Sequence, residues 1–260
     1  MTERRIDVVA GVDGLTPEVG PIFAVIGVFD GIHLGHQYLL RRLVEEARSR
    51  SARPAVITFD SHPDEVILGA APPLLLDPAD RLTLLGELGV EVVVVQHFDA
   101  ALRNTEYDAF IDRITSRTRL AGLLMTPDAA FGHDRRGTPD TVSDLGRRVG
   151  FDLVVAPQLE IEGRSVRSSD IRAAIAAGDL GTAARLLGRP YAIVGSLDSD
   201  GTLRPTMPFA LPPPGSYPAS LDGGAPTTVE IADGKPRVAG DKASRPIGPV
   251  RIVLETLAPA

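Results

Sequence analysis

The sequence predicts an α/β protein in which a parallel sheet with helices on both faces precedes a small β-rich domain. Apolar runs of strand length alternate with helix-like periodic segments as far as residue 187, which is typical of a parallel sheet. A glycine-rich turn joins the first long apolar run to the first helical pattern. After Gly188 the helical periodicity disappears, and the last 71 residues hold 12 of the 22 prolines. We therefore expect two domains, at residues 1–188 and 189–260.

Each element is expected from a local pattern. Strands are expected where short apolar runs are bounded by turn residues, at 6–10, 22–28, 55–59, 90–96, 123–126 and 151–156. Helices are expected where apolar residues recur at helical spacing, from the glycine turn to about residue 49 and at 78–88, 106–120, 138–149, 169–177 and 179–187. Asp77 followed by Pro78 is typical of a helix start. Short β segments are expected at 191–196, 217–221, 227–231 and 250–254.

Composition limits the class of protein. With 43% hydrophobic and 23% charged residues, the chain of 260 residues has enough apolar material for a folded core. The net charge is −7, and residues 189–260 hold seven basic and seven acidic residues, so the acidic excess lies in the first 188 residues. An acidic domain binds nucleic acid poorly, and we expect no nucleic-acid partner.

The absence of cysteine excludes disulfides, thiolate metal sites and cysteine nucleophiles. The first residues contain no apolar run of the kind that a secretory signal needs, and the run 92–95 is too short to span a bilayer. We therefore expect a cytoplasmic protein without a membrane partner. The sequence does not predict the oligomeric state.

The segment 27–36 (GVFDGIHLGH) is the strongest functional signal in the sequence. A strand, a tight turn and a helix N-terminus in succession favour a phosphate site, because unpaired N–H groups and the helix dipole point outward there. His33 and His36 are three residues apart, which predicts that both project from one face of the first helical turn. Gly31 and Gly35 lack a Cβ, so we expect a ligand to approach the backbone closely. The structural alternative to a ligand site is that the glycines only form a turn and that the histidine is hydrogen-bonded within the fold.

Two further segments have a structural and a functional interpretation each. In 166–172 (VRSSDIR), Ser168 or Ser169 is expected to cap a helix, and both hydroxyls with Arg172 would equally suit a triphosphate clamp. The segment 128–137 (DAAFGHDRRG) is either a solvated loop or a mobile loop that brings arginine to a phosphate and Phe131 to an aromatic ring. His62 and Asp128 follow expected strands, so both are placed at the ligand-binding edge of the sheet.

Other nucleotide and metal sites are not indicated. A zinc site made from His33, His36, His62 and His133 has no carboxylate at a familiar spacing, and a helix N-terminus disfavours a cation. Magnesium carried in by a nucleotide is favoured instead, because Mg²⁺ keeps its waters and needs few protein ligands. The sequence has no Gly-Lys-Ser/Thr P-loop, which argues against a Walker-type kinase.

With these residues in hand, the chain resembles the bacterial FAD synthetases, in which an FMN adenylyltransferase module of the Rossmann-like HxGH nucleotidyltransferase type precedes a riboflavin kinase module. Residues 27–36 are similar to the HxGH signature without a mismatch. Residues 59–63 resemble the Phe-x-Pro-His-Pro segment, with Ser61 in place of a proline. Residues 128–137 resemble the family's arginine loop, with Ala129 replacing an aromatic residue, and 167–172 resemble Ser-Ser-Thr-x-Ile-Arg, with Arg167 at the first serine. The resemblance covers residues 5–195.

The resemblance implies transfer of AMP from ATP to the phosphate of FMN, which gives FAD and pyrophosphate, with ATP as co-substrate and Mg²⁺ as cofactor. The catalytic residues that it implies are His33, His36 and Arg172. The ATP-binding residues that it implies are Gly27, Phe29, Asp30, Gly31, Gly35, Asp128, Ser168 and Ser169. Flavin or its phosphate would contact Phe59, His62, Phe131 and Arg135 or Arg136. No protein metal ligand is certain, and Asp128 is the one candidate.

The C-terminal part departs from the kinase module of this family. The expected Gly-Phe-Pro-Thr-Ala-Asn segment corresponds to 203–208 (LRPTMP), so Pro208 replaces the asparagine. Glu230 and Glu255 are candidates for the catalytic glutamate only by default. We therefore expect that riboflavin kinase activity is lost and that a degenerate barrel remains.

Two other functions stay open. Ser61 and Ala129 fall where flavin contacts are expected, which leaves a nucleotidyltransferase of the same fold with another phosphomonoester acceptor. Arg167 in the clamp and the altered C-terminal part leave a flavin or ATP sensor without turnover.

Overall fold

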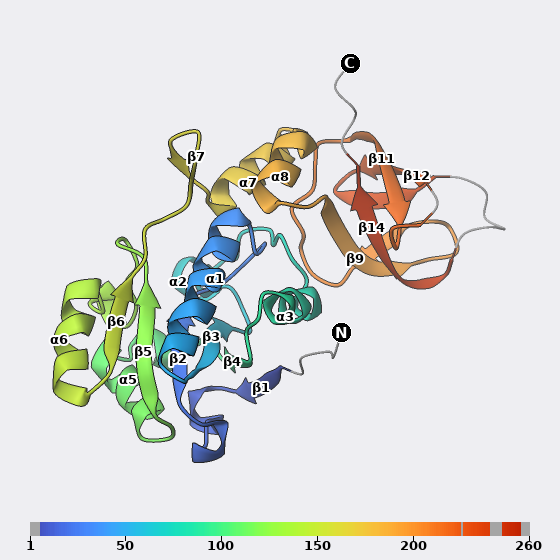
Figure 1. Cartoon of the computed structure of the whole chain (residues 1–260). Coiled ribbons are helices and arrows are strands. Elements are labelled where there is room, and N and C mark those ends of the chain that lie inside the picture. Colours follow the sequence, from blue (N-terminus) through green and yellow to red (C-terminus); the bar gives the residue numbers. More distant parts are fainter. Residues whose placement is uncertain (1–5, 225, 240–245, 256–260) are drawn as a thin grey trace. The chain divides into compact units, whose positions relative to one another are not determined.

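The computed structural model describes residues 6–224, 226–239 and 246–255. It contains two compact units (Figure 1). The first unit comprises residues 1–29, 35–72 and 82–165, and the second comprises 30–34, 73–81 and 166–260. The segment 30–34 of the HxGH motif thus belongs to the second unit, although the residues on both sides of it belong to the first. The expected absence of a leader rests partly on residues 1–5, which lie outside the described residues.

The first unit contains a sheet of six parallel strands. These are β1 (Asp7–Ala10), β2 (Ile22–Ile26), β3 (Arg53–Phe59), β4 (Val92–Gln96), β5 (Leu120–Met125) and β6 (Asp152–Val155). Their order across the sheet is β1-β4-β3-β2-β5-β6, and every neighbouring pair is parallel. The predicted Rossmann-like α/β class is confirmed. In such a sheet the carboxyl ends of all strands share one edge, which is where ligands bind.

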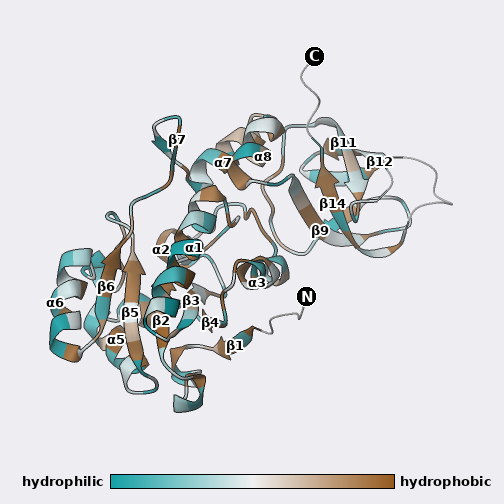
Figure 2. Ribbon diagram, viewed as in Figure 1, coloured by the Kyte–Doolittle hydropathy of each residue, from teal (hydrophilic) through white to brown (hydrophobic). Residues whose placement is uncertain are grey.

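Helices cover both faces of this sheet. Helices α5 (Tyr107–Thr115) and α6 (Pro139–Val149) bury apolar residues in one core with Ile22 and Ala24 of β2. Phe23 points to the opposite face, where the guanidinium of Arg50, just after α1 (Leu34–Ser49), lies 4.9 Å from its ring centre. Figure 2 shows strands that are largely apolar and helices that carry both polar and apolar residues, as a three-layer arrangement requires.

Several helix ends agree with the sequence, and one does not. Helix α3 (Pro78–Glu87) begins at the predicted proline, and α6 has a capping box between Thr138 and Thr141. The helix expected at 106–120 ends instead at Thr115. The prediction is wrong at this end because the Thr118 hydroxyl donates to the carbonyl of Gly20 at 2.7 Å and Leu120 already pairs with β2.

Short elements were not predicted from the sequence. They are the helices α2 (Pro63–Leu68) and α4 (Ala100–Arg103), the hairpin of β7 (Glu160–Ile161) and β8 (Arg164–Ser165), and the 3-10 turns at Val12–Gly14, Pro17–Val19 and His133–Arg135. Most of them are too short to show periodicity. Helix α2 had a local signal, because His62 caps it by accepting the N–H of Asp64 and Pro63 occupies the first position.

The second unit contains α7 (Ser168–Ala176), α8 (Leu180–Leu187) and an antiparallel sheet. Its strands are β9 (Tyr191–Leu197), β10 (Leu203–Pro205), β11 (Gly215–Leu221), β12 (Pro226–Ala232), β13 (Lys235–Val238) and β14 (Gly248–Leu254), in the order β10-β9-β14-β11-β12-β13. The N–H of Val238 donates to the carbonyl of Gly201, which bonds the two edges to each other and makes the sheet a nearly closed barrel. The expected small β-rich domain is confirmed, and its strands β10 and β13 were missed.

The core of the second unit joins helices and sheet. Ile171 and Ile175 of α7 and Leu187 of α8 are buried in one cluster with Tyr191 and the inner residues of the barrel. Both helices therefore belong to the second compact unit. The expected domain boundary at residues 188 and 189 stays a prediction.

Candidate active site

In the second unit, the loop 30–34 and the N-terminus of α7 meet at Asp30. The Asp30 carboxylate is buried and accepts two hydrogen bonds. One comes from the Leu75 N–H at 2.9 Å and the other from Nη2 of Arg172 at 2.6 Å. The Asp30 carbonyl accepts the hydroxyl of Ser168 at 3.0 Å. Two motifs that are about 140 residues apart in sequence are thereby bonded to each other.

The predicted helix cap at Ser168 or Ser169 is wrong. The N-cap residue of α7 is Arg167, which makes no side-chain cap bond. Ser168 is the first helical residue, and its hydroxyl is used by the Asp30 carbonyl instead. Ser169 is exposed on the first turn, and its role in ATP binding stays a prediction.

His33 is buried in a positively charged environment. Its side chain is 4% exposed, and burial, followed by the charges of Arg189 and Arg172, lowers its pKa to about 4. The imidazole is therefore neutral near pH 7. A neutral imidazole can donate one N–H to an anion. Because the ring carries no charge, its burial does not incur the desolvation cost of an ion.

The turn that carries His33 has an unusual backbone. Phe29, Gly31 and Ile32 all have positive φ angles, of 52°, 84° and 38°. Arg189 fixes this turn by donating to the carbonyl of Gly31 at 2.6 Å and to that of Ile32 at 3.2 Å. A non-glycine residue in the left-handed region costs about 1–3 kcal/mol and persists only where its surroundings hold it. The turn is thus held by the second unit's own residues.

The prediction that both histidines lie in the first helical turn is wrong for His33. Helix α1 begins at Leu34, so His33 precedes it, because the left-handed Ile32 breaks the helical backbone. His36 lies in the first turn of α1, and Gly35 lies just before it. The His36 ring contacts the buried Phe29 ring at a centroid distance of 5.1 Å and an angle of 57°. Both rings belong to the first unit.

Gly31 does not leave room for a ligand on its Cβ side. A Cβ there would lie 3.1 Å from Cδ1 of Leu75 and 3.4 Å from Leu187, so packed side chains already occupy that direction. The expectation that a ligand approaches the backbone closely is therefore wrong at Gly31. Glycine is required there because of its φ of 84°. A Cβ on Gly27 would likewise lie 3.1 Å from the Phe29 ring.

In the first unit, a cavity of about 560 Å³ opens at the carboxyl edge of the sheet. It is lined by residues at or after the carboxyl ends of β2, β3, β4 and β5, among them Gly27, Phe59, His62, Phe98, Phe131 and Arg135. The rings of Phe59 and Phe98 meet edge to face, with centroids 5.2 Å apart. Aromatic walls with a few polar groups suit a flat heteroaromatic ligand.

The structure distinguishes the two adjacent arginines. Arg135 lines the cavity, and its Nη2 donates to the Asp128 carbonyl at 3.4 Å. Arg136 instead forms ion pairs with Glu106 at 3.5 Å and Asp134 at 3.6 Å. The left-handed backbone of Asp134 and Arg135 turns the two side chains in different directions.

Sequence reasoning missed the contribution of β4 to this cavity. Phe98 lies just after that strand, and Asp60 holds it by accepting its N–H at 3.2 Å. The same Asp60 carboxylate bonds Nδ1 of His97 at 2.6 Å. This bond raises the pKa of His97, and it lowers the pKa of Asp60 against the opposing effect of burial. An aromatic residue directly after an apolar strand, at the same edge as Phe59, was an available signal. Arg103 and Asn104 line the same cavity, and no pattern in the sequence indicated them.

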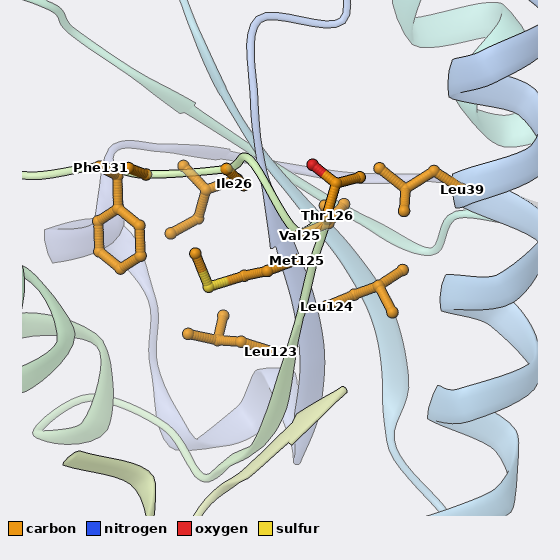
Figure 3. A pocket seen from close by; sticks show the side chains of 10 residues that line it. Val25, Ile26, Leu39, Leu123, Leu124, Met125, Thr126 and Phe131 are labelled. Carbon is orange, nitrogen blue, oxygen red and sulfur yellow. The ribbon is translucent and has the colours of Figure 1, made fainter. Parts of the chain in front are cut away.

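A second, smaller pocket of about 80 Å³ lies beside β2 and β5 (Figure 3). Its walls are apolar, with Leu123 and Met125 from β5 and Leu39 from α1, and Phe131 lines both this pocket and the larger cavity. It is too small for a nucleotide.

Asp128, the candidate metal ligand, accepts the hydroxyl of Thr126 at 2.8 Å and also bonds the amide of Gln158.

Two other features are absent from the described residues. Among the described residues no group of three or more His, Asp or Glu side chains could hold a metal ion. Within those same residues, no helix combines the length and apolar character that a membrane crossing requires.

A Rossmann-like parallel sheet whose first long strand leads into an HxGH turn defines the chain as a nucleotidyltransferase in fold. The chain belongs to the FAD synthetase family, because the model of that family, described as FAD synthetase, matches residues 17–170. It is 36% identical over 191 residues to the bifunctional riboflavin kinase/FMN adenylyltransferase of Pseudomonas fluorescens, covering 73% of this chain and 61% of that protein. Identity to the protein of the same name from Haemophilus influenzae is 33%, covering 71% of this chain and 60% of the relative.

The chain therefore spans about 61% of the length of the first of these curated relatives. Among solved structures, a macrolide-efflux protein from Streptococcus pneumoniae has a similar fold, with a TM-score of 0.81 and 22% identity. That match covers 96% of this chain and 90% of the other.

Proposed function

We propose that the protein is an FMN adenylyltransferase, which transfers AMP from ATP to the phosphate of FMN and releases FAD and pyrophosphate. The observation that carries this proposal is the bonding of the HxGH loop to the Ser168–Arg172 turn through Asp30, beside a buried neutral His33. The names of the two relatives support the choice of acceptor.

The reaction needs little from the protein beyond position and charge. An oxygen of the FMN phosphate attacks the α-phosphorus of ATP, the bond to the bridging oxygen breaks, and pyrophosphate leaves. A phosphate monoester is already ionised at neutral pH, so neither a strong base nor a covalent enzyme intermediate is required. Positioning and stabilisation of the developing charge supply the acceleration.

Within the second unit, we assign the triphosphate to His33, Ser169 and Arg172. His36, in the first unit, stays a predicted catalytic residue. Arg172 already uses Nε for the Pro73 carbonyl and Nη2 for Asp30, and a guanidinium has five N–H donors in all. It can therefore be both an anchor of the loop and a phosphate donor. The remaining residues of the predicted ATP site, namely Gly27, Phe29, Asp30, Gly31, Gly35 and Ser168, shape the turn, as the packing of Phe29 and the bonds of Asp30 support.

We assign the isoalloxazine ring of FMN to the cavity of the first unit. A volume of about 560 Å³ lies within the range of roughly 300–1,000 Å³ that is usual for small-molecule sites. Phe59, Phe98 and Phe131 supply its aromatic lining and His62 a polar group. Arg135, rather than Arg136, is the candidate for the FMN phosphate, because it lines the cavity.

We also propose that Mg²⁺ enters with ATP and that the protein acts in the cytoplasm, where ATP is available. The donor set fits a nucleotide-held ion, since Mg²⁺ needs few protein ligands and the described residues offer no cluster of three. Asp128 is the residue that would help to hold it, and the ion would supply neutralisation of phosphate charge.

Riboflavin kinase activity is proposed to be absent. The hydroxyl of Thr206, which the kinase resemblance would place at a metal, donates to the Asp77 carboxylate at 2.8 Å. Pro208 supplies no side-chain donor, and Glu230 and Glu255 are both exposed. These side chains are used for packing or face solvent.

The test is an assay of the purified chain with Mg-ATP and either FMN or riboflavin, followed by separation of the flavins. We expect FAD and pyrophosphate from FMN and no product from riboflavin. Turnover of other phosphomonoesters in preference to FMN would refute the choice of acceptor. Binding of ATP without pyrophosphate release would refute the enzyme.

A further inference from the structure

The segment 73–81 is bonded to the HxGH loop within the second unit. The Leu75 N–H donates to Asp30, and the Pro73 carbonyl accepts Nε of Arg172 at 2.7 Å. The Leu75 side chain is 1% exposed and packs where a Cβ of Gly31 would otherwise point. Any displacement of 73–75 would therefore displace the turn before His33.

The same segment is bonded to the C-terminal barrel by its backbone. The Leu74 N–H donates to the Pro208 carbonyl at 2.8 Å, and the Ala210 N–H donates to the Leu74 carbonyl at 2.9 Å. Together they form a parallel bridge between Leu74 and Phe209. The buried hydroxyl of Tyr191, the first residue of β9, donates to the Ala210 carbonyl at 2.8 Å.

Two side-chain contacts fix the rest of the segment to the barrel. Thr206, just after β10, donates to the Asp77 carboxylate, whose other oxygen caps α3 through the Ala79 N–H. Arg251 of β14 forms an ion pair with Asp80. Asp77 is 9% exposed, so removing the Thr206 hydroxyl takes a partner from a largely buried carboxylate.

The contacts made by Leu74, Asp77 and Asp80 are additional to the pairing between the strands of the barrel. The strands already pair with one another along the whole sheet. What the contacts hold is a segment from the middle of the chain, and through it Asp30. Arg189, two residues before β9, donates directly to the Gly31 and Ile32 carbonyls.

We propose that the C-terminal barrel is a positioning domain for adenylyl transfer, which fixes the loop 30–34, and with it His33, through residues 73–81. Its effect on catalysis rests on the proposed function, whereas its effect on the loop does not. Thr206, Arg251 and Tyr191 are positioning residues, because their contacts are with the protein and not with the proposed substrates.

Hydrogen–deuterium exchange of the whole chain without substrates tests the structural half. In the double variant Thr206→Val, Arg251→Met, amides of peptides covering 30–34 and 73–81 should exchange about tenfold faster than in the unaltered chain. The matched control is Thr202→Val, Arg204→Met, which removes a hydroxyl bonded to Asp200 and an arginine paired with Asp198 elsewhere in the same unit. We expect that control to leave both peptides unchanged.

An unchanged exchange rate at 30–34 in the double variant would overturn the positioning role. If the double variant fails to fold, the single variant Arg251→Met carries the same measurement, with an expected change of about threefold. The variant Thr206→Ser keeps the hydroxyl, so peptides covering 30–34 and 73–81 should exchange as slowly in it as in the unaltered chain.

Steady-state FAD synthesis tests the catalytic half. We expect kcat of the double variant to fall about fivefold to tenfold, with the KM for FMN unchanged, because the flavin cavity is lined by residues of the first unit. Equal kcat in the two chains, despite faster exchange at 30–34, would overturn the catalytic role. If the unaltered chain made no FAD while the exchange result held, the proposed function would fail and the structural role would stand.

Discussion

The two regions assigned to substrates are built in opposite ways. The loop 30–34 is almost fully buried, and its polar groups bond to Ser168, Arg172, Leu75 and Arg189. The cavity proposed for flavin is an open hollow of about 560 Å³ with aromatic residues at the ends of strands and on the loops that follow them. A group that acts on a developing charge must be held in advance, because any movement during the reaction costs energy. A cavity that admits and releases a ring can tolerate a looser wall.

The largest expected effect is on turnover when one preorganised donor is removed. We expect His36→Ala to lower kcat by about two to three orders of magnitude, the usual effect of losing a single fixed donor. Stability to urea should change little, because the ring is only partly buried. A rate within a factor of three of the unaltered chain would remove His36 from the mechanism.

Loss of the buried ion pair should destabilise the loop more than any surface pair. Asp30→Asn leaves the Arg172 guanidinium, 18% exposed, without its carboxylate, and we expect a loss of about 3 kcal/mol in the free energy of unfolding. The control Asp13→Asn breaks an exposed pair with Arg113 and should cost less than about 1 kcal/mol. Urea unfolding of both variants measures the difference, and equal losses would contradict the contrast between buried and exposed pairs.

The buried imidazole should make stability depend on pH. Because the folded pKa of His33 is lowered to about 4 from its ordinary 6.5, the folded state resists protonation. Its contribution is fully present above pH 6.5 and is lost as the pH falls through 4, by about 3 kcal/mol in total. Urea unfolding between pH 7 and pH 4 should show this slope in the unaltered chain. The slope should be smaller in His33→Gln, and equal slopes would contradict burial of a neutral His33.

The smallest effect is expected at the cavity and distinguishes its two arginines. Arg135→Gln should raise the KM for FMN about tenfold with little change in the KM for ATP, because it removes a charge from the cavity lining. Arg136→Gln, which breaks only exposed pairs with Glu106 and Asp134, should change the KM for FMN less than twofold. Steady-state kinetics of both variants measures this, and the reverse order would assign the phosphate to Arg136.

The parts of the structure that local patterns determine were predictable. The strands and most helices follow apolar spacing, and the carboxyl edge of the sheet collects Phe59, His62 and Phe131 as expected. The bonds of Asp30 were not predictable, because they join residues that are 45 and 142 positions apart and depend on packing. The same reason explains why Ser168 was assigned to a cap. The different directions of Arg135 and Arg136 depend on left-handed backbone at non-glycine residues, which no periodicity reveals.

The bond between Gly201 and Val238 also has a consequence for how the protein behaves at high concentration. Because it joins the residue two positions before β10 to the last residue of β13, it uses one donor and one acceptor that an open sheet edge would offer to a neighbouring chain. Within the part of the chain that the structure describes, the parallel sheet has no such closure, and its outermost strands carry exposed apolar residues, Val8 in β1 and Val155 in β6. Self-association through strand pairing would therefore start at β1 or β6 and leave the barrel intact.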